Sequence, residues 1–444
     1  MPPADGAPTG LPWRCGLLLA ALTAAGFALT LYIFYPGVMT YDARFVYEDI
    51  AKNTLGDWQS PAMTVLWAWI DPLAPGPASM FLLMATMYWL AFGLLAVTFA
   101  HRSIGLAVIL LLLALSPPAF VFQGIIWRDV LFANSWLLAA ALSFAAAERG
   151  ARLRLSAEFL ALGLLALGVL LRPNALVAAP LLAAAILWPR RLSFKRTAIA
   201  YAPIGFALFG LVQFIYYGAL GATRQHPLQS IMVFDLGGIS HFARQNQFPV
   251  VWSEAETKQL LNTCYRPTQW DIYWRIEPCE FVMRKLEGEE KLFGTPAVTT
   301  AWVSAIAHHP VAYLEHRAAF MWNFLARENL TMWTDDVYDP SKKVFADRPA
   351  FNALVAVHDA LRSSPLFRAG TWLVLCAAVC AFAWRRRDTA VGQLGQDGTL
   401  FTLRPPPAPG GEWLDTVLPF QGAPDDGALP VGASSLARMA CCMA

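Results

Sequence analysis

Apolar residues along this chain gather into long uninterrupted blocks, with short polar connections between them. A helix of about 20 apolar residues crosses the roughly 30 Å of hydrocarbon in a bilayer. Blocks of about this length, two of them shorter, occupy residues 14–35, 78–100, 103–122, 130–148, 156–171, 175–189, 198–218 and 365–384. The pattern therefore predicts an all-α polytopic membrane protein with about eight transmembrane helices. The two short blocks, separated only by the sequence RPN, are typical of a tight helical hairpin.

The positive charges of the connections indicate how the chain is oriented. Alternate connections hold twelve lysines and arginines on one side of the membrane and four on the other. Because cytoplasmic connections carry the excess of such residues, both termini are predicted to be cytoplasmic. The twelve are Arg14, Arg102, Arg149, Arg152, Arg154, Arg190, Arg191, Lys195, Arg196, Arg385, Arg386 and Arg387, and the four are Arg44, Lys52, Arg128 and Arg172. We expect a multi-pass protein of the cell inner (plasma) membrane.

Four regions follow from this plan. Residues 1–218 form a transmembrane module, residues 219–363 a mainly helical exterior domain, and residues 364–387 the last transmembrane helix. Residues 388–444 contain the stretches RPPPAPGG and GAPDDGALP without periodicity, and they are predicted to be a disordered cytoplasmic tail. Two exterior helices, 296–307 and 311–327, are too short to span and are expected to lie at the outer membrane boundary.

Composition supports the membrane assignment and excludes some partners. Hydrophobic residues make up 57% of the chain and charged residues 14%, both unlike soluble averages. A net charge of +2 gives no basis for binding nucleic acid. The cysteines show no zinc spacing. Cys264 and Cys279 share the exterior domain, where a disulfide is expected, with two unpaired buried thiols as the alternative.

Acidic residues gather directly after the first span, in the stretch YPGVMTYDARFVYEDIAKNTLGDWQSP of residues 35–61. A solvated loop is the ordinary explanation of such a group. Two other connections on the same side also carry charges next to apolar helices. These residues are Asp42, Glu48, Asp49 and Asp57 in the first loop, Arg128 and Asp129 in WRDV, and Arg172 in RPNA.

Such a set of side chains suits transfer of a group from a lipid-linked phosphate. A carboxylate can accept a proton from an acceptor hydroxyl as a general base, and a second can order the acceptor or bind a divalent cation. The planar guanidinium of arginine matches phosphate oxygens. We therefore expect Asp42 and Asp129 to be catalytic, and Arg128 and Arg172 to bind the phosphate.

The first loop resembles that of the GT-C superfamily of polyprenyl-phosphate-sugar-dependent glycosyltransferases. It is most similar to the branch of protein O-mannosyltransferases and lipid A aminoarabinose transferases. The resemblance covers about residues 14–218. The matching residues are Asp42, Tyr47, Gly56, Asp57, Trp58 and Pro61, then Asp129 at the start of the fourth span and Arg172 as the later basic residue.

The resemblance implies an inverting transferase of the cell envelope that acts outside the cytoplasm. Its partners would be a polyprenyl-phosphate-linked sugar, an extracytoplasmic glycan, lipid or protein acceptor, and the bilayer. One departure is Ala43, where the family has glutamate, so Glu48 and Asp49 are candidate substrate-binding replacements. No cofactor is certain. A divalent cation, Mg or Mn, held by Asp42 and Asp129 remains an open alternative.

Two other classes of function stay open at this level. A transporter or flippase of lipid-linked saccharides would place ionisable residues near the bilayer centre and would often contain repeated halves. The apolar blocks are nearly free of charge and no repeat is visible, which favours the enzyme. A non-catalytic membrane scaffold is the third class, and Ala43 is the residue that keeps it open.

Overall fold

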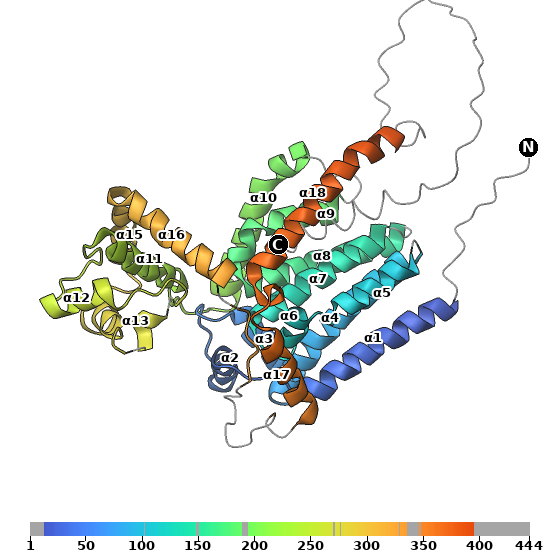
Figure 1. Cartoon of the computed structure of the whole chain (residues 1–444), viewed down its shortest axis with the longest axis horizontal. Helices are drawn as coiled ribbons and strands as arrows, with labels where there is room; N and C mark the ends of the chain where they lie inside the picture. Colours follow the sequence, from blue (N-terminus) through green and yellow to red (C-terminus); the bar gives the residue numbers. More distant parts are fainter. Residues whose placement is uncertain are drawn as a thin grey trace, which may run out of the picture. The chain divides into compact units, whose positions relative to one another are not determined.

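The computed structural model describes residues 13–101, 103–147, 151–188, 194–269, 271–275, 277–327, 329–334, 345 and 348–394 (Figure 1). Over these residues the chain is helical, and its extended pairings are the isolated bridges of Val38 with Ile125 and of Gly56 with Thr223. Arg102, Arg149, Arg190 and Arg191 of the predicted inner connections lie outside the described residues. So does the predicted tail from residue 395 onward, whereas residues 388–394 continue a helix.

Five of the described helices are long and apolar enough to cross a membrane. They correspond to five of the eight predicted spans, and their ends agree with the predicted blocks within a few residues. These helices are α1 (Trp13–Phe34), α4 (Pro77–Ala100), α7 (Arg128–Ala147), α8 (Ala151–Leu171) and α10 (Phe194–Gln213). The last of them, α10, is followed directly by a π-helical turn, Phe214–Ala219.

The other three predicted spans are shorter or interrupted. The block 103–122 divides into α5 (Ile104–Leu113) and α6 (Pro117–Phe122), because two consecutive prolines lack the N–H groups that would continue the first helix. The block 175–189 contains a 3₁₀ turn and then α9 (Ala179–Leu187). The last block, 365–384, contains the first part of α18 (Ala369–Leu394), and the apolar part of this helix is Ala369–Phe382.

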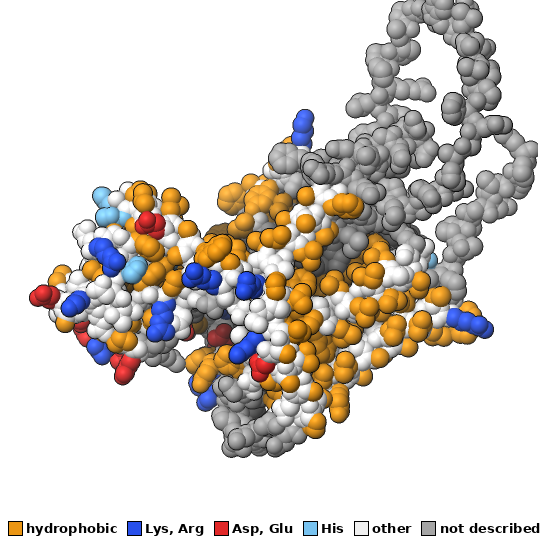
Figure 2. All heavy atoms as spheres, viewed as in Figure 1, with side chains coloured by type: hydrophobic (Ala, Val, Ile, Leu, Met, Phe, Trp, Pro, Cys, Tyr) orange, Lys and Arg blue, Asp and Glu red, His pale blue; other side chains and the backbone are white. Residues whose placement is uncertain are grey.

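Helix α4 occupies the centre of the transmembrane module and packs against α1, α5 and α7. Small residues and polar contacts between helices favour such packing, since lipid is as apolar as the helix surfaces. Gly26 of α1 leaves room for the ring of Trp89, whose Nε1 donates to Thr30 Oγ1 at 2.8 Å. Asn134 of α7 donates to the Met84 carbonyl oxygen of α4 at 3.1 Å. Hydrophobic side chains cover most of the face of this module in Figure 2.

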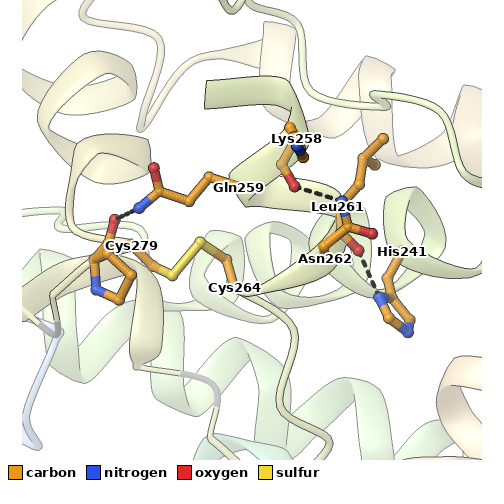
Figure 3. The surroundings of a disulfide bond; sticks show 8 residues. His241, Lys258, Gln259, Leu261, Asn262, Cys264 and Cys279 are labelled. Carbon is orange, nitrogen blue, oxygen red and sulfur yellow. Dashed lines mark hydrogen bonds between the residues drawn. A yellow bond between two sulfur atoms is a disulfide. The ribbon is translucent and has the colours of Figure 1, made fainter. Parts of the chain in front are cut away.

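The predicted exterior domain has a hydrophobic core of its own, formed by residues between 232 and 312. Cys264 and Cys279 form a disulfide inside it with Cα atoms 5.5 Å apart, and beside it Gln259 Nε2 donates to the Pro278 carbonyl oxygen at 2.5 Å (Figure 3). The elements are α11 (Pro227–Ala243), α12 (Glu254–Asn262), α13 (Ile272–Arg275), α14 (Phe281–Met283), η4 (Arg284–Glu289), α15 (Pro296–His308), α16 (Pro310–Trp322) and η5 (Asn323–Arg327).

A further amphipathic helix, α17 (Pro349–Leu361), follows the exterior domain and contacts the transmembrane module. Its Phe351 lies edge-on to Phe34 of α1, with ring centroids 6.2 Å apart. A 3₁₀ turn, Pro365–Phe367, then leads to α18. Residues from Leu373 onward belong to a separate compact unit, which the structure describes only as the continuation of this helix to Leu394.

Candidate functional site

The first loop lies alongside the connection that precedes α7. Val38 N donates to the Gly124 carbonyl oxygen at 2.8 Å, and Ile126 N donates to the Val38 carbonyl oxygen at 3.1 Å. Just beyond these bonds on both segments, Trp127 Nε1 donates to Thr40 Oγ1 at 2.7 Å. Thr40 is the N-cap of α2 (Tyr41–Lys52), and α7 begins one residue after Trp127. The first turns of α2 and α7 therefore start side by side.

Asp42 lies in the first turn of α2 and its side chain is exposed. A carboxylate at this position interacts favourably with the helix dipole. Gln59, only 7% exposed, donates from Nε2 to Asp42 Oδ1 at 3.1 Å. One carboxylate oxygen is thus held by a buried amide while the side chain remains accessible, which suits a general base. The neighbouring Ala43 is buried, so this position faces the interior.

Asp129 and Arg172, which come from two different connections, form an ion pair. Asp129 is in the first turn of α7, and Arg172 follows the last residue of α8. Arg172 Nε donates to Asp129 Oδ1 at 2.6 Å, and Arg172 Nη2 donates to the same oxygen. Both side chains are partly exposed. The fold therefore brings together the second predicted acid and the predicted phosphate-binding arginine.

Arg128 connects this ion pair to the first loop. Its Nη1 donates to the carbonyl oxygen of Trp58 at 2.9 Å, while its Nε is buried without a hydrogen-bond partner in the part of the chain that the structure describes. Trp58 directly precedes Gln59, which donates to Asp42, and Arg128 directly precedes Asp129, which accepts from Arg172. The four charged residues thus form one electrostatic group at one end of the apolar helices.

The motif GDWQSP anchors the first loop to the start of the exterior domain. Asp57 accepts hydrogen bonds from Tyr217 Oη at 2.7 Å and from Gln225 N at 2.5 Å. Trp58 N donates to Gln225 Oε1 at 2.9 Å. Gly56 leaves room for this contact, because a Cβ at this position would lie 2.3 Å from the same Gln225 oxygen. Asp57 therefore fixes the loop, and its carboxylate is already occupied.

The end of the motif anchors the loop to α8. Ser60 caps α3 (Pro61–Ile70) by accepting from Met63 N at 3.2 Å, and Pro61 occupies the first helical position, where no N–H is needed. The Ser60 hydroxyl also donates to the Leu170 carbonyl oxygen at 3.0 Å. Since Leu170 lies two residues before Arg172, this contact fixes the distance between the first loop and the ion pair.

Glu48 and Asp49 make their hydrogen bonds to residues of α2 or directly after it. Hydrogen bonds from Arg44 and then Lys52 lower the pKa of the Glu48 carboxyl. Asp49 Oδ1 accepts from Thr54 Oγ1 at 2.9 Å at the end of the helix. At 1.5 Å per residue these two side chains lie about 9–11 Å along the helix from Asp42. The predicted substrate-binding role of Glu48 and Asp49 stays a prediction.

A divalent cation held by Asp42 and Asp129 stays a prediction. Among the described residues no group of three or more histidine, cysteine, aspartate or glutamate side chains is placed to hold an ion. Mg²⁺ is usually bound through one or two carboxylates, several waters and substrate phosphates. Asp129 is engaged by Arg172, so only Asp42 presents an unpaired carboxylate to such an ion.

Sequence reasoning did not identify Gln59 as a partner of Asp42. It lies between the matched residues Trp58 and Pro61, but its amide reaches the carboxylate only after the loop has folded back over α2. The contact of Arg128 with the Trp58 carbonyl oxygen has the same origin. Comparison with protein-family models, curated proteins and solved structures finds no match to the chain. The resemblance to glycosyltransferases therefore depends on the quoted residues alone.

Proposed function

We propose that the protein is an integral-membrane glycosyltransferase. It would move a sugar from a polyprenyl-phosphate carrier to a glycan, lipid or protein acceptor outside the cytoplasm. The observation that supports this most directly is the grouping of Asp42 and Arg128 with the Asp129–Arg172 ion pair at one end of apolar, membrane-length helices. A lipid-linked donor would present its phosphate and sugar at this level of the bilayer.

In the proposed reaction Asp42 accepts the proton of an acceptor hydroxyl. The acceptor oxygen then attacks the anomeric carbon, and the bond between this carbon and the phosphate oxygen breaks. The bonding electrons leave with the polyprenyl phosphate. A single displacement of this kind inverts the configuration at the anomeric carbon, as the resemblance implies. General-base assistance of this type contributes about 10²- to 10⁴-fold to the rate.

The two arginines would hold the departing phosphate. Arg128 Nε is buried and has no hydrogen-bond partner among the described residues, and a buried polar group left unsatisfied costs about 1–3 kcal/mol, more when it is charged. A phosphate oxygen would satisfy it. Arg172 places two of its donors on one oxygen of Asp129, so the carboxylate orients the guanidinium. Asp129 thus assists by positioning Arg172 in addition to any contact with the acceptor.

The proposed topology has eight crossings, both termini in the cytoplasm and the site facing outward. The distribution of lysines and arginines supports this topology, and so do contacts between distant parts of the chain. The first loop, residues 35–61, is hydrogen-bonded to Trp127 before α7, to Leu170 at the end of α8 next to RPN, and to Gln225 at the start of the predicted exterior domain. Connections that must meet at one site have to lie on one side of the membrane.

The position of ionisable residues argues against a transporter. In α1, α7, α8 and α10 the Asp, Glu, Lys and Arg residues lie within the first half of each helix, and α4 contains none. A transport pathway would need such groups near the bilayer centre. The scaffold alternative predicts that the four charged residues of the site can be replaced without consequence, which mutation tests directly.

Donor consumption is the experiment that tests the proposed function. Membranes from cells that overproduce the protein would be incubated with a panel of radiolabelled polyprenyl-phosphate sugars. We expect one donor to be consumed faster than by membranes that contain the Asp42→Asn variant at equal abundance. If no donor in a panel that includes hexose, aminopentose and N-acetylhexosamine derivatives is consumed above this control, the glycosyltransferase proposal is wrong.

A further inference from the structure

A buried polar cluster fixes the rotation of α16 in the exterior domain. Its centre is Asp235 of α11, which is fully buried. Asp235 Oδ2 accepts from Arg317 Nη2 at 2.7 Å and from Trp302 Nε1 at 2.8 Å, and Asp235 Oδ1 lies 3.0 Å from His316 Nε2. His316 needs space that Gly238 provides, since a Cβ there would be 2.2 Å from its Nδ1. The polar face of α16 therefore points inward at this level.

The opposite face of α16 is an exposed apolar stripe. It consists of Val311, Leu314, Ala318, Met321 and Trp322, spaced at three, four, three and one residues. Val311 is 67% exposed, Leu314 65% and Trp322 60%. This spacing places the five side chains along one side of a helix. Large apolar side chains gathered in this way on a surface mark a site of interaction with another apolar phase or partner.

The end of the stripe lies at the start of an apolar helix. Residues Asn323–Arg327 continue α16 as a π-helical turn. The carbonyl oxygen of Leu325 packs against Gly370, where a Cβ would come within 2.6 Å of it. Gly370 is the second residue of α18, whose apolar part is Ala369–Phe382. The Trp322 end of the stripe is therefore held where the chain enters a lipid-compatible segment.

We infer that the α16 stripe docks on the outer surface of the bilayer. At 1.5 Å per residue its 13 residues extend about 20 Å, so α16 is too short to cross about 30 Å of hydrocarbon and would lie in the interface. Tryptophan near one end is typical of residues at the lipid headgroups. A second copy of the chain is a poorer match, because stable protein interfaces use about 20–30 residues from each partner.

Contact of α16 with lipid would also help to hold the exterior domain next to the first loop, whatever reaction takes place there. The exterior domain meets the first loop through Trp58, whose ring lies 6.2 Å from that of Trp274 and 6.4 Å from that of Phe293. Docking of α16 on lipid would attach this domain to the membrane directly, in addition to its contacts with the first loop.

Fluorescent labelling of the full-length protein in lipid nanodiscs tests the inference. Leu314→Cys and Met321→Cys would be labelled with an environment-sensitive dye and exposed to nitroxide lipids that carry the quencher either at the headgroup or deep in the acyl chain. Ala255→Cys, on the exposed surface of α12, is the matched control. The native chain, whose seven cysteines include Cys15 and Cys376, gives the labelling background.

We expect severalfold stronger quenching at positions 314 and 321 than at position 255, and stronger quenching by the headgroup nitroxide than by the deep one. Equal quenching at all three positions would show that the stripe does not contact lipid. Oxidative cross-linking of Leu314→Cys between two copies would also overturn the inference, and would assign the stripe to a dimer interface. None of these outcomes depends on transfer activity, so they separate the inference from the proposed function.

Discussion

At the scale of single residues, the pairing of Asp129 with Arg172 most restricts how the site can work. Removal of the guanidinium would leave the carboxylate unpaired and a bound phosphate with one arginine fewer. Hydrogen bonds to charged groups contribute about 1.5–3 kcal/mol, so Arg172→Ala is expected to lower kcat/KM for the donor by about 10- to 100-fold. Arg172→Lys keeps the charge but loses the planar fork, and it should restore only part of the activity.

Steady-state kinetics with varied donor concentration would measure this effect. Asp129→Asn belongs to the same series, because it weakens the contact that orients Arg172. We expect both variants to raise KM for the donor more than KM for the acceptor. Unchanged donor kinetics in Arg172→Ala would remove this residue from the phosphate site.

Asp57 is expected to affect stability more than turnover. Its carboxylate accepts hydrogen bonds from Tyr217 and Gln225, and both are part of the attachment of the first loop. Asp57→Asn should lower the free energy of unfolding by about 1–3 kcal/mol, and Tyr217→Phe by about 1 kcal/mol. Thermal unfolding in detergent would show this as lower midpoints. Loss of transfer with an unchanged midpoint would instead place Asp57 in the chemistry.

At the scale of elements, the disulfide joins the end of α12 to the start of α14. Cys264 and Cys279 are fifteen residues apart, and closing a loop of this size stabilises a fold by about 3 kcal/mol in the chain-entropy model. Cys264→Ser with Cys279→Ser should destabilise the exterior domain by this order and leave α1–α10 in the membrane. Mass spectrometry of the unreduced protein should find the bridge, and two free thiols would contradict it.

Long helices were more predictable from the sequence than short ones. Uninterrupted apolar residues define α1, α4, α7 and α8, because a lipid environment leaves the backbone no alternative to helix. The block 103–122 is equally apolar, yet Pro117 and Pro118 divide it. Apolarity alone therefore predicted a span for this block but did not give its helix boundaries.

The candidate site was predictable only in part. Position next to apolar helices identified Asp42, Asp129 and Arg172, but not which of them pair, because pairing depends on how three distant connections meet. The local role of Glu48 was visible in the sequence, since Arg44, Glu48 and Lys52 are spaced four residues apart on one helix face. No feature of the sequence indicated that Gln59 would contact Asp42.

At the scale of the whole molecule, the orientation in the membrane can be tested by thiol accessibility. Asn53→Cys and Val251→Cys place thiols at exposed positions of the first loop and the exterior domain. Both should react with an impermeant reagent in intact cells. His101→Cys, between α4 and α5, should react only after the membrane is opened. Labelling of Val251→Cys only after lysis would reverse the proposed topology.

The proposed role of Asp42 as the general base of a sugar transfer is tested most directly by comparing two variants, Asp42→Asn and Asp49→Asn. Asp42→Asn keeps the size of the side chain but cannot accept a proton at neutral pH. Asp49→Asn makes the same change two helical turns away on α2, at a residue whose carboxylate accepts a hydrogen bond from Thr54 Oγ1. Purified variants of equal thermal stability would be assayed with the donor that membranes consume.

We predict that Asp42→Asn lowers the transfer rate by about 10²- to 10⁴-fold, while Asp49→Asn retains most of the activity. Near-normal transfer by Asp42→Asn would contradict the account, and loss of transfer in Asp49→Asn alone would move the base to the other end of α2.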